Sequence, residues 1–340
     1  SSPLHLGLKG TYRGKRFEIV GRVQFHHAAG GLWDEWYASF PNDRWGWVAE
    51  AQGRFYISFQ KDLPDSVPLP ALDDLQPGER VTLADQTLVV AEVGRATVAG
   101  AEREMPFVLT PGASHYYSDL YGEERRFVSL DFEKDRPAVF VGQEATLEDL
   151  GISPDAVAPE KDPRQISGVQ VNCPQCGGPL ELRAPDQSLR VVCQNCHALL
   201  DATHGNLNYL ETLNVGRAEF VIPIGAVGSL DDVEYTVIGA MQRSVTYEGL
   251  DYYWSEYLLY HPRVGFRWLV ESENHWSFVV PVSPGDVDEG STSAKVNGTT
   301  FRLYQQATAT VRYVIGEFYC KVSLGESVYA RDFIAPPQSL

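Results

Sequence analysis

The sequence lacks any long apolar run. No stretch approaches the roughly 18 consecutive apolar residues that a membrane-spanning helix needs, and no charged-then-apolar signal peptide opens the chain. We therefore predict neither direct membrane insertion nor export, and we expect the protein in the cytoplasm. The chain opens on Ser-Ser-Pro without an initiator Met, so we expect further residues to precede it in the natural protein.

Basic residues are also scarce. The 340 residues include 28 Lys and Arg against 45 Asp and Glu, which gives a formal net charge of −17. Proteins that bind nucleic acid contact the phosphate backbone through clustered Lys and Arg, so this balance argues against a nucleic-acid partner. The charge allows a cationic partner, although an acidic surface also simply keeps a protein in solution.

Sequence motifs of common catalytic sites are absent. The chain contains no G-x-S-x-G, no Walker loop, no G-x-G-x-x-G and no H-E-x-x-H. His26 and His27 are adjacent, but neighbouring residues of a strand point to opposite faces, so we interpret the pair as a coincidence. Cys320 stands alone in a β-like run and is interpreted as a buried filler. These absences favour a non-enzymatic protein.

Four of the five cysteines form two C-x-x-C pairs with 16 residues between the pairs. Each pair can form a knuckle in which backbone amides point at the sulfurs, and Gly177 and Gly178 permit the tight turn. Four thiolates are the tetrahedral set that Zn²⁺ takes in structural sites. The sequence therefore predicts one structural zinc ion on four ligands, which are Cys173, Cys176, Cys193 and Cys196.

Two other interpretations of the cysteines are weaker. Residues 193–197 match C-x-x-C-H, the motif for covalent haem attachment, but haem would leave the first pair unexplained and would require export. A catalytic zinc site needs an open fourth coordination position, and four thiolates close it. We therefore predict a closed, structural site.

The chain contains an internal duplication. Three blocks recur in the same order with small changes of offset. They are residues 17–21 with 235–239, residues 33–55 with 254–276, and residues 96–119 with 309–332, at offsets of 218, 221 and 213. Three ordered matches are unlikely to arise by chance, so we predict two copies of one domain in which Trp47 corresponds to Trp268.

Both copies have the pattern of β-strands. Apolar residues alternate along residues 45–49, Gly53 turns the chain, and the alternation resumes along residues 55–59, as in a hairpin with one buried face. Asn297-Gly298 predicts a type I′ hairpin turn in the second copy. Helical periodicity is scarce, and its best candidate is a short turn at residues 147–150. We predict an all-β protein with two homologous antiparallel barrel or roll domains joined by a small zinc ribbon.

The predicted boundaries follow from these patterns. Pro154, Pro159 and Pro163 lie in an acidic stretch that suits an exposed connector. The predicted parts are a first β-rich repeat domain at 1–142, a linker at 143–168, the ribbon at 169–204, a second linker at 205–222 and a second repeat domain at 223–340.

The sequence resembles a bacterial family, the domain of unknown function 4178. Three runs carry the resemblance in the first copy, at residues 17–22, 31–36 and 45–50. The second copy is more loosely similar through residues 238–239, 254–257 and 268–271, with Ala240 in the place of Arg22. Members often pair the domain with four-cysteine ribbons, sometimes before the first copy. No such ribbon precedes this one, which again indicates residues upstream.

The resemblance implies no assigned activity. Genes of the family are often found near polyamine-synthesis homologues and membrane-stress proteins, which implies polyamines or membrane complexes as partners to consider. This is an association between genes, and it names no site residue.

A Trp-x-Glu-aromatic motif occurs in both copies. It fits a strand whose aromatic residues are buried and whose Glu bonds a neighbour, which is the interpretation we favour. It also fits a pocket for a cation, through charge and cation–π attraction. We expect any pocket in the first copy, near Glu35 and Trp36. The candidate ligand-binding residues are Trp33, Glu35, Trp36, Glu50, Trp254, Glu256, Tyr257 and Glu271.

Two hypotheses for the function remain. The preferred one is a non-enzymatic tandem scaffold that binds other proteins, in a membrane-stress or polyamine-linked complex, because two copies suit multivalent docking. The alternative is a sensor or enzyme that acts on a cationic small molecule such as a polyamine. A deep acidic and aromatic pocket would favour the alternative, whereas open sheet edges or flat apolar patches would favour the scaffold.

Overall fold

The computed structural model is all-β, as predicted. The described residues contain no α-helix, and their only helical elements are 3₁₀ turns such as η1 (Leu72–Asp74) and η4 (Pro284–Asp286). The helix candidate at residues 147–150 is a hydrogen-bonded turn, closed by the Leu150 amide on the Thr146 carbonyl at 3.1 Å. The structure describes residues 2–28, 32–51, 53–106, 109–134, 136–153, 156–157, 169–185, 187–203, 206–214, 216 and 218–340.

Some residues named above lie outside this description. Gly31 of the family resemblance and the linker residues Pro154, Pro159 and Pro163 are among them. The two linkers predicted at 143–168 and 205–222 are therefore described only in part.

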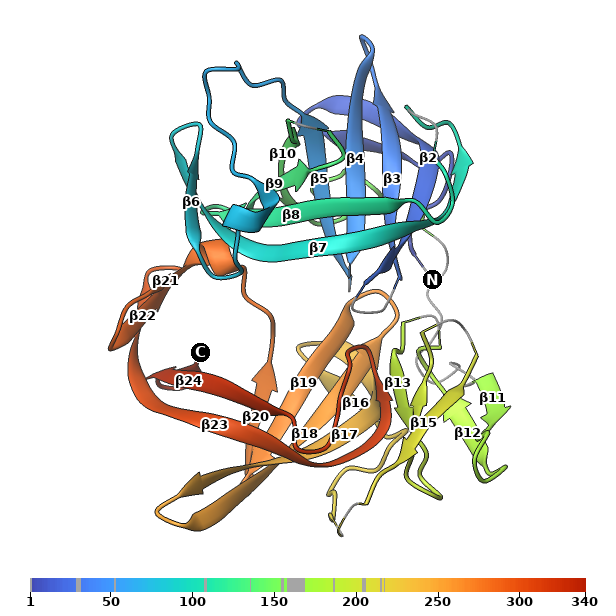
Figure 1. Cartoon of the computed structure of the whole chain (residues 1–340), viewed down its shortest axis with the longest axis vertical. Coiled ribbons are helices and arrows are strands. Elements are labelled where there is room, and N and C mark those ends of the chain that lie inside the picture. The colour runs from blue at the N-terminus through green and yellow to red at the C-terminus, as the bar shows by residue number, and fades with distance from the viewer. Residues whose placement is uncertain are drawn as a thin grey trace.

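The first copy is a closed antiparallel barrel (Figure 1). Eight strands follow one another around it, in the order β2-β3-β4-β5-β10-β9-β8-β7, and β7 pairs back onto β2. Two short strands, β1 and β6, pair with β2 and β7. The strands are β1 (Lys9–Tyr12), β2 (Lys15–His27), β3 (Leu32–Phe40), β4 (Arg44–Ala51), β5 (Arg54–Gln60), β6 (Arg80–Leu83), β7 (Gln86–Arg103), β8 (Ser114–Gly122), β9 (Arg126–Asp131) and β10 (Ala138–Ala145).

Two of the apolar clusters of this barrel lie on its outer face. Period-2 alternation places Trp36, Val48 and Ile57 outside, where residues near Leu4 and Leu150 cover them. A second cluster forms the outside of β7–β10, where the segment before β6 covers it. Because both clusters face outward, the alternate side chains point into the lumen, and these need not be apolar.

The second copy repeats these elements in an open sheet. The strands are β16 (Val227–Leu230), β17 (Val233–Tyr247), β18 (Leu250–His261), β19 (Gly265–Ser272), β20 (His275–Val279), β21 (Val287–Glu289), β22 (Ser293–Val296), β23 (Thr299–Phe318), β24 (Ser327–Ala335) and β25 (Gln338–Ser339). The first barrel closes through β9 and β10. In the second copy, β25 pairs with β24 and corresponds to the start of β9. The residues through Leu340 contain no more of that strand.

The pairing registers confirm the duplication. Tyr37 lies opposite Trp47 in β3–β4, and Leu258 lies opposite Trp268 in β18–β19. A β-bulge before Gly21 recurs before Gly239, at the predicted offset of 218. The pairing of β17 with β23 matches that of β2 with β7 at offsets of 218 and 213, and the pairing of β23 with β24 matches that of β7 with β8 at an offset of 213. Asn297 and Gly298 have φ of 48° and 81°, as the predicted type I′ turn requires.

The ribbon is joined to the second copy by a continuous sheet. Its strands are β11 (Val169–Asn172), β12 (Pro179–Leu182), β13 (Arg190–Val192), β14 (Ala198–Asp201) and β15 (Asn208–Thr212). Strand β13 pairs with β23, with Val191 opposite Glu317. The Glu317 side chain is only 2% exposed and accepts hydrogen bonds from the amides of Arg183 and Ala184 at 2.6 and 3.0 Å. Burial raises the pKa of Glu317, and these donors oppose that rise.

The two copies also touch directly. Gly53, in the turn between β4 and β5, has φ of 77°, and a Cβ built there would lie 2.5 Å from the Val264 carbonyl. Only glycine allows this close approach of the two turns. In Figure 1 the first barrel lies above the second copy and the ribbon.

Candidate functional site

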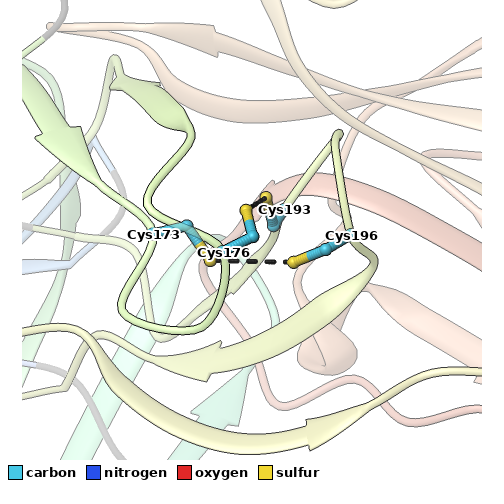
Figure 2. Close-up of side chains that lie close together, drawn as sticks. All are labelled: Cys173, Cys176, Cys193 and Cys196. Atoms are coloured by element: carbon cyan, nitrogen blue, oxygen red, sulfur yellow. Dashed lines mark hydrogen bonds between the residues drawn. The ribbon is translucent and has the colours of Figure 1, made fainter.

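The four predicted zinc ligands lie together on two knuckles (Figure 2). Cys173 follows β11 and Cys193 follows β13. In each knuckle the first cysteine donates its amide to the residue five positions on, Gly178 at 2.8 Å and Ala198 at 3.0 Å. Backbone amides also face the sulfurs, because Gly178 N lies 3.4 Å from Cys176 Sγ and Asn195 N lies 3.4 Å from Cys193 Sγ. This is the knuckle geometry expected from the spacing.

His197 has a backbone role in the second knuckle. It occupies the left-handed position, with φ of 56°, that Gly177 occupies in the first knuckle, with φ of 72°. His is one of the non-glycine residues that tolerate this conformation. Its ring packs edge-on against Tyr313 at 6.0 Å. The C-x-x-C-H match therefore has a structural explanation that involves no haem.

The sulfur geometry fits a zinc ion. The four Sγ atoms lie within 4.8 Å of one another, and Cys173–Cys196 and Cys176–Cys193 are each separated by 3.8 Å. A tetrahedron with Zn–S bonds of about 2.3 Å has edges of about 3.8 Å. A disulfide needs about 2.05 Å, so these cysteines form none. Burial raises the pKa of Cys196 to about 12, whereas the Gly178 amide lowers the pKa of Cys176.

The lumen of the first barrel contains a cavity of about 760 Å³. This volume is within the range of small-molecule sites. Ribbon residue Ser188 and second-copy residues Phe266 and Tyr319 also line it, so it extends to the place where the three parts of the chain meet. Its aromatic lining from the barrel includes Phe25, Trp33, Trp47, Tyr56, Tyr117, Tyr121 and Phe127.

Carboxylates from four different strands face this cavity. They are Glu35 on β3, Glu92 on β7, Asp119 on β8 and Asp131 on β9. Among the described lining residues, the only Lys or Arg is Arg22, which is engaged with Asp34 at 3.0 Å. The lumen is therefore strongly acidic.

Glu35 is held against an indole. Trp33 Nε1 donates to Glu35 Oε1 at 3.1 Å, and the Trp33 ring stacks on Phe25 with centroids 5.1 Å apart. Burial raises the pKa of Glu35, and the charge of Asp131 adds to the rise, whereas His115 and the Trp33 hydrogen bond oppose it. Charging this carboxylate therefore carries a free-energy cost.

Asp119 and Glu92 face each other across β7 and β8 but titrate differently. Burial raises the pKa of Asp119 to about 7, and the charges of Glu92 and Glu35 add to the rise. Hydrogen bonding to His27, at 2.6 Å from Nε2, lowers the pKa of Glu92, and the Tyr117 hydroxyl also donates to it at 3.0 Å. Asp119 is therefore partly protonated near neutral pH, whereas Glu92 is charged.

A further group lies at the end of β9. His115 Nδ1 is 3.2 Å from Glu133 Oε1 and 3.8 Å from Asp131 Oδ1, and the three donor atoms lie within 4.8 Å of one another. Imidazole and carboxylate together can bind a divalent ion. The sequence reasoning missed this group and Asp119, although the alternation of His115, Tyr117, Asp119 and Tyr121 places four polar or aromatic side chains on one strand face.

The other predicted residues of the first copy lie on the outer face. Trp36 is 3% exposed in the outer core, with the Arg22 guanidinium 5.3 Å from its ring centre. The lumen therefore contains Glu35 and Trp33, and Trp36 does not line it. Glu50 borders the cavity from the other face of β4, where it accepts a hydrogen bond from the Ser2 hydroxyl. Burial raises the pKa of Glu50 to about 7.

In the second copy, only part of the predicted set resembles a site. Trp254 Nε1 donates to Glu256 Oε1 at 2.7 Å, as in the first copy. Tyr257 is fully buried, and its hydroxyl accepts a hydrogen bond from the Val221 amide at 2.9 Å. Glu271 accepts from the Asn274 amide at 2.9 Å in the turn between β19 and β20. Tyr257 and Glu271 therefore have structural contacts.

Comparison with known families agrees with this organisation. A family model described as a domain of unknown function (DUF4178) matches residues 5–146 and 223–340, and a zinc-ribbon model described as Nudix N-terminal matches residues 172–199. No curated protein and no solved structure matches the chain. No helix in the described ranges has the length and apolar character needed to cross a membrane.

The raised pKa of Asp119 predicts an unusual dependence of stability on pH. Between about pH 4 and pH 7 the folded state binds more protons at Asp119 than the unfolded state, so its contribution to stability falls as pH rises. We expect Asp119→Asn to raise the free energy of unfolding by roughly 1–4 kcal/mol at pH 7 and to change it little at pH 4. Urea unfolding at both pH values measures this.

Asp149→Asn is the matched control. The Thr146 amide and Arg125 lower the pKa of Asp149, so its contribution is lost as pH falls, and this variant should instead be less stable than the parent at pH 7. An Asp119→Asn variant that is destabilised equally at both pH values would contradict the assignment.

Proposed function

The chain belongs to the family of the domain of unknown function DUF4178, and we propose that its first copy is a binding domain for a small organic cation. One observation carries the proposal: the acidic, aromatic cavity, in which four carboxylates from four strands face aromatic rings with no Lys or Arg side chain engaged among them.

The physical argument concerns the cost of this arrangement. Carboxylates surrounded by protein lose hydration, and they repel one another more strongly than in water. A cation in the cavity offsets both costs, and aromatic faces attract it further through their quadrupoles. An apolar or anionic ligand would neither offset these costs nor be attracted to the aromatic faces. The cavity is therefore suited to a ligand that is positively charged and partly organic.

Of the two functional hypotheses, this cavity supports the one based on a cationic small molecule. The scaffold hypothesis, with protein partners in a membrane-stress or polyamine-linked complex, remains a prediction. Catalysis is a second candidate, favoured by the opposed titration of Asp119 and Glu92, because carboxylates of different pKa can act as acid and base.

We further propose that the four thiolates hold a structural zinc ion. The fit of the sulfur tetrahedron supports this, and four protein ligands leave no position open for substrate. Ser188 precedes the second knuckle in the chain and Thr203 follows it, and both residues line the cavity. Zinc would therefore fix part of the cavity lining without taking part in chemistry.

Protein purified without added metal should contain one zinc per chain, measured by elemental analysis. Because the ribbon has a small core, removing the ion with a chelator should unfold it, and Cys176→Ser should lower the zinc content. Cys320→Ser is the control and should keep full zinc, because Cys320 lies outside the cluster. Iron with a haem absorbance, or a folded ribbon without metal, would contradict the assignment.

Titration calorimetry with spermidine, propylguanidinium, tetramethylammonium and divalent metal ions tests the cation proposal. We expect at least one organic cation to bind one per chain, more weakly as salt rises, and to quench tryptophan fluorescence through Trp33 and Trp47. Glu92→Gln should weaken binding by about tenfold, which corresponds to about 1.4 kcal/mol.

The control for this experiment is Glu148→Gln, which removes an exposed carboxylate away from the cavity. If only the metal ions bind, the ligand of the cavity is a metal ion, held by His115, Asp131 and Glu133, and not an organic cation. Failure of every organic cation to bind would overturn the proposal.

A further inference from the structure

The second copy already contains a cation beside Glu256, the residue that corresponds to Glu35. Arg243 on β17 lies opposite Trp254 on β18, and Arg243 Nε donates to Glu256 Oε2 at 3.2 Å. Trp254 Nε1 donates to the other oxygen of the same carboxylate at 2.7 Å. The Arg243 and Glu256 side chains are 19% and 18% exposed. The largely buried Glu256 carboxylate therefore accepts one hydrogen bond from an indole and one from a guanidinium, on different oxygens.

The first copy has the same carboxylate and indole but lacks the guanidinium. Trp33 Nε1 donates to Glu35 Oε1 at 3.1 Å, as Trp254 does to Glu256. By the shared register, the position of Arg243 is taken by Phe25, which lies opposite Trp33. None of the ion pairs between described residues joins Glu35 to a Lys or Arg.

The second pair of lumen acids differs between the copies in the same way. Glu92 and Asp119 of the first copy correspond to Gln305 and Asp332 of the second. Gln305 Nε2 donates to Asp332 Oδ2 at 2.7 Å, so an amide replaces one carboxylate and satisfies the other. The second copy thus pairs Glu256 with a guanidinium and Asp332 with an amide, whereas the described residues of the first copy place neither group on Glu35 or Asp119.

We infer that the cation bound in the first barrel places a hydrogen-bonding nitrogen, as in a guanidinium or primary ammonium group, on Glu35 Oε2, where Arg243 lies in the second copy. This inference rests on the proposed function and specifies the ligand class. Phe25 then supplies a flat apolar wall, stacked on Trp33, in place of the aliphatic part of the arginine side chain.

The chemistry of the site disfavours cations without N–H donors. A buried carboxylate oxygen loses its hydrogen bonds to water. Without a protein or ligand donor, most of the free energy of that lost hydration is not recovered. A guanidinium satisfies it with a charge-assisted hydrogen bond and presents a planar face to aromatic rings. A quaternary ammonium supplies charge but no donor, so it should bind more weakly at Glu35.

Moving the internal cation into the first copy tests the inference. Phe25→Arg should place a guanidinium on Glu35, lower the affinity for propylguanidinium, which has the shape of an arginine side chain, at least tenfold, and raise the melting temperature. His26→Arg is the matched control. It adds the same charge one residue along β2 on the outer face and should bind propylguanidinium like the parent.

A second variant keeps the test decisive if Phe25→Arg does not fold. Glu35→Gln should lower propylguanidinium affinity at least tenfold and change tetramethylammonium affinity much less. The parent protein should bind propylguanidinium at least tenfold more tightly than tetramethylammonium.

The outcomes separate this inference from the proposed function. If organic cations bind the parent but Phe25→Arg and Glu35→Gln bind propylguanidinium equally well, the placement on Glu35 is wrong and the cation site stands. Equal affinity of the parent for both probes would overturn the need for an N–H donor. If no organic cation binds the parent, both proposals fail.

Discussion

The enclosure of acidic side chains inside the first barrel is the constraint on which the rest of the structure depends. Strand alternation gives the barrel two faces, and the inner one contains Glu35, Asp119 and Asp131. Two of the barrel's hydrophobic clusters form on the outer face, where they need a cover. Residues near Leu4 and Leu150, and the segment before β6, supply that cover. A third cluster, around Phe25, Trp33 and Tyr117, lies on the inner face and lines the cavity.

The duplication shows what happens to the same framework without this constraint. The second copy keeps the bulges, the registers and the Trp–Glu hydrogen bond of the first. It pairs Glu256 with Arg243 and has Gln305 in the place of Glu92. The strand registers are the same in both copies despite these substitutions. The divergence of the copies thus lies in the lumen side chains, which is expected if one copy binds a ligand and the other supports it.

The ribbon links these two parts. Its strand β13 extends the sheet of the second copy, and Glu317 fixes the neighbouring chain through the Arg183 and Ala184 amides. The same ribbon contributes to the cavity lining near Ser188. A metal that ordered the knuckles would therefore also order ribbon residues that line the cavity, such as Ser188.

The fold class, the ribbon and the turn at Asn297-Gly298 could be predicted from the sequence because each depends on a short local pattern. Cysteine spacing identified the knuckles, and Asn297-Gly298 identified a turn. The sequence predicts Trp33 and Trp36 in one site. Residues three positions apart on a strand point to opposite faces, and Trp36 lies in the outer core. Asp119 and Asp131 had no motif, because their proximity to Glu35 depends on barrel closure through β9 and β10. The duplication gave no help, since residues through Leu340 include no counterpart of β10.

The most direct test of the account is the number of protons exchanged when a cation binds. Calorimetry at about pH 6 in buffers of different ionisation enthalpy measures it. Burial raises the pKa of Glu35, and that of Asp119 to about 7, so an entering cation should displace protons from the lumen. The account predicts release of close to one proton per cation and affinity that rises from pH 5 to pH 7. Binding without proton release, at an affinity independent of pH, would contradict it.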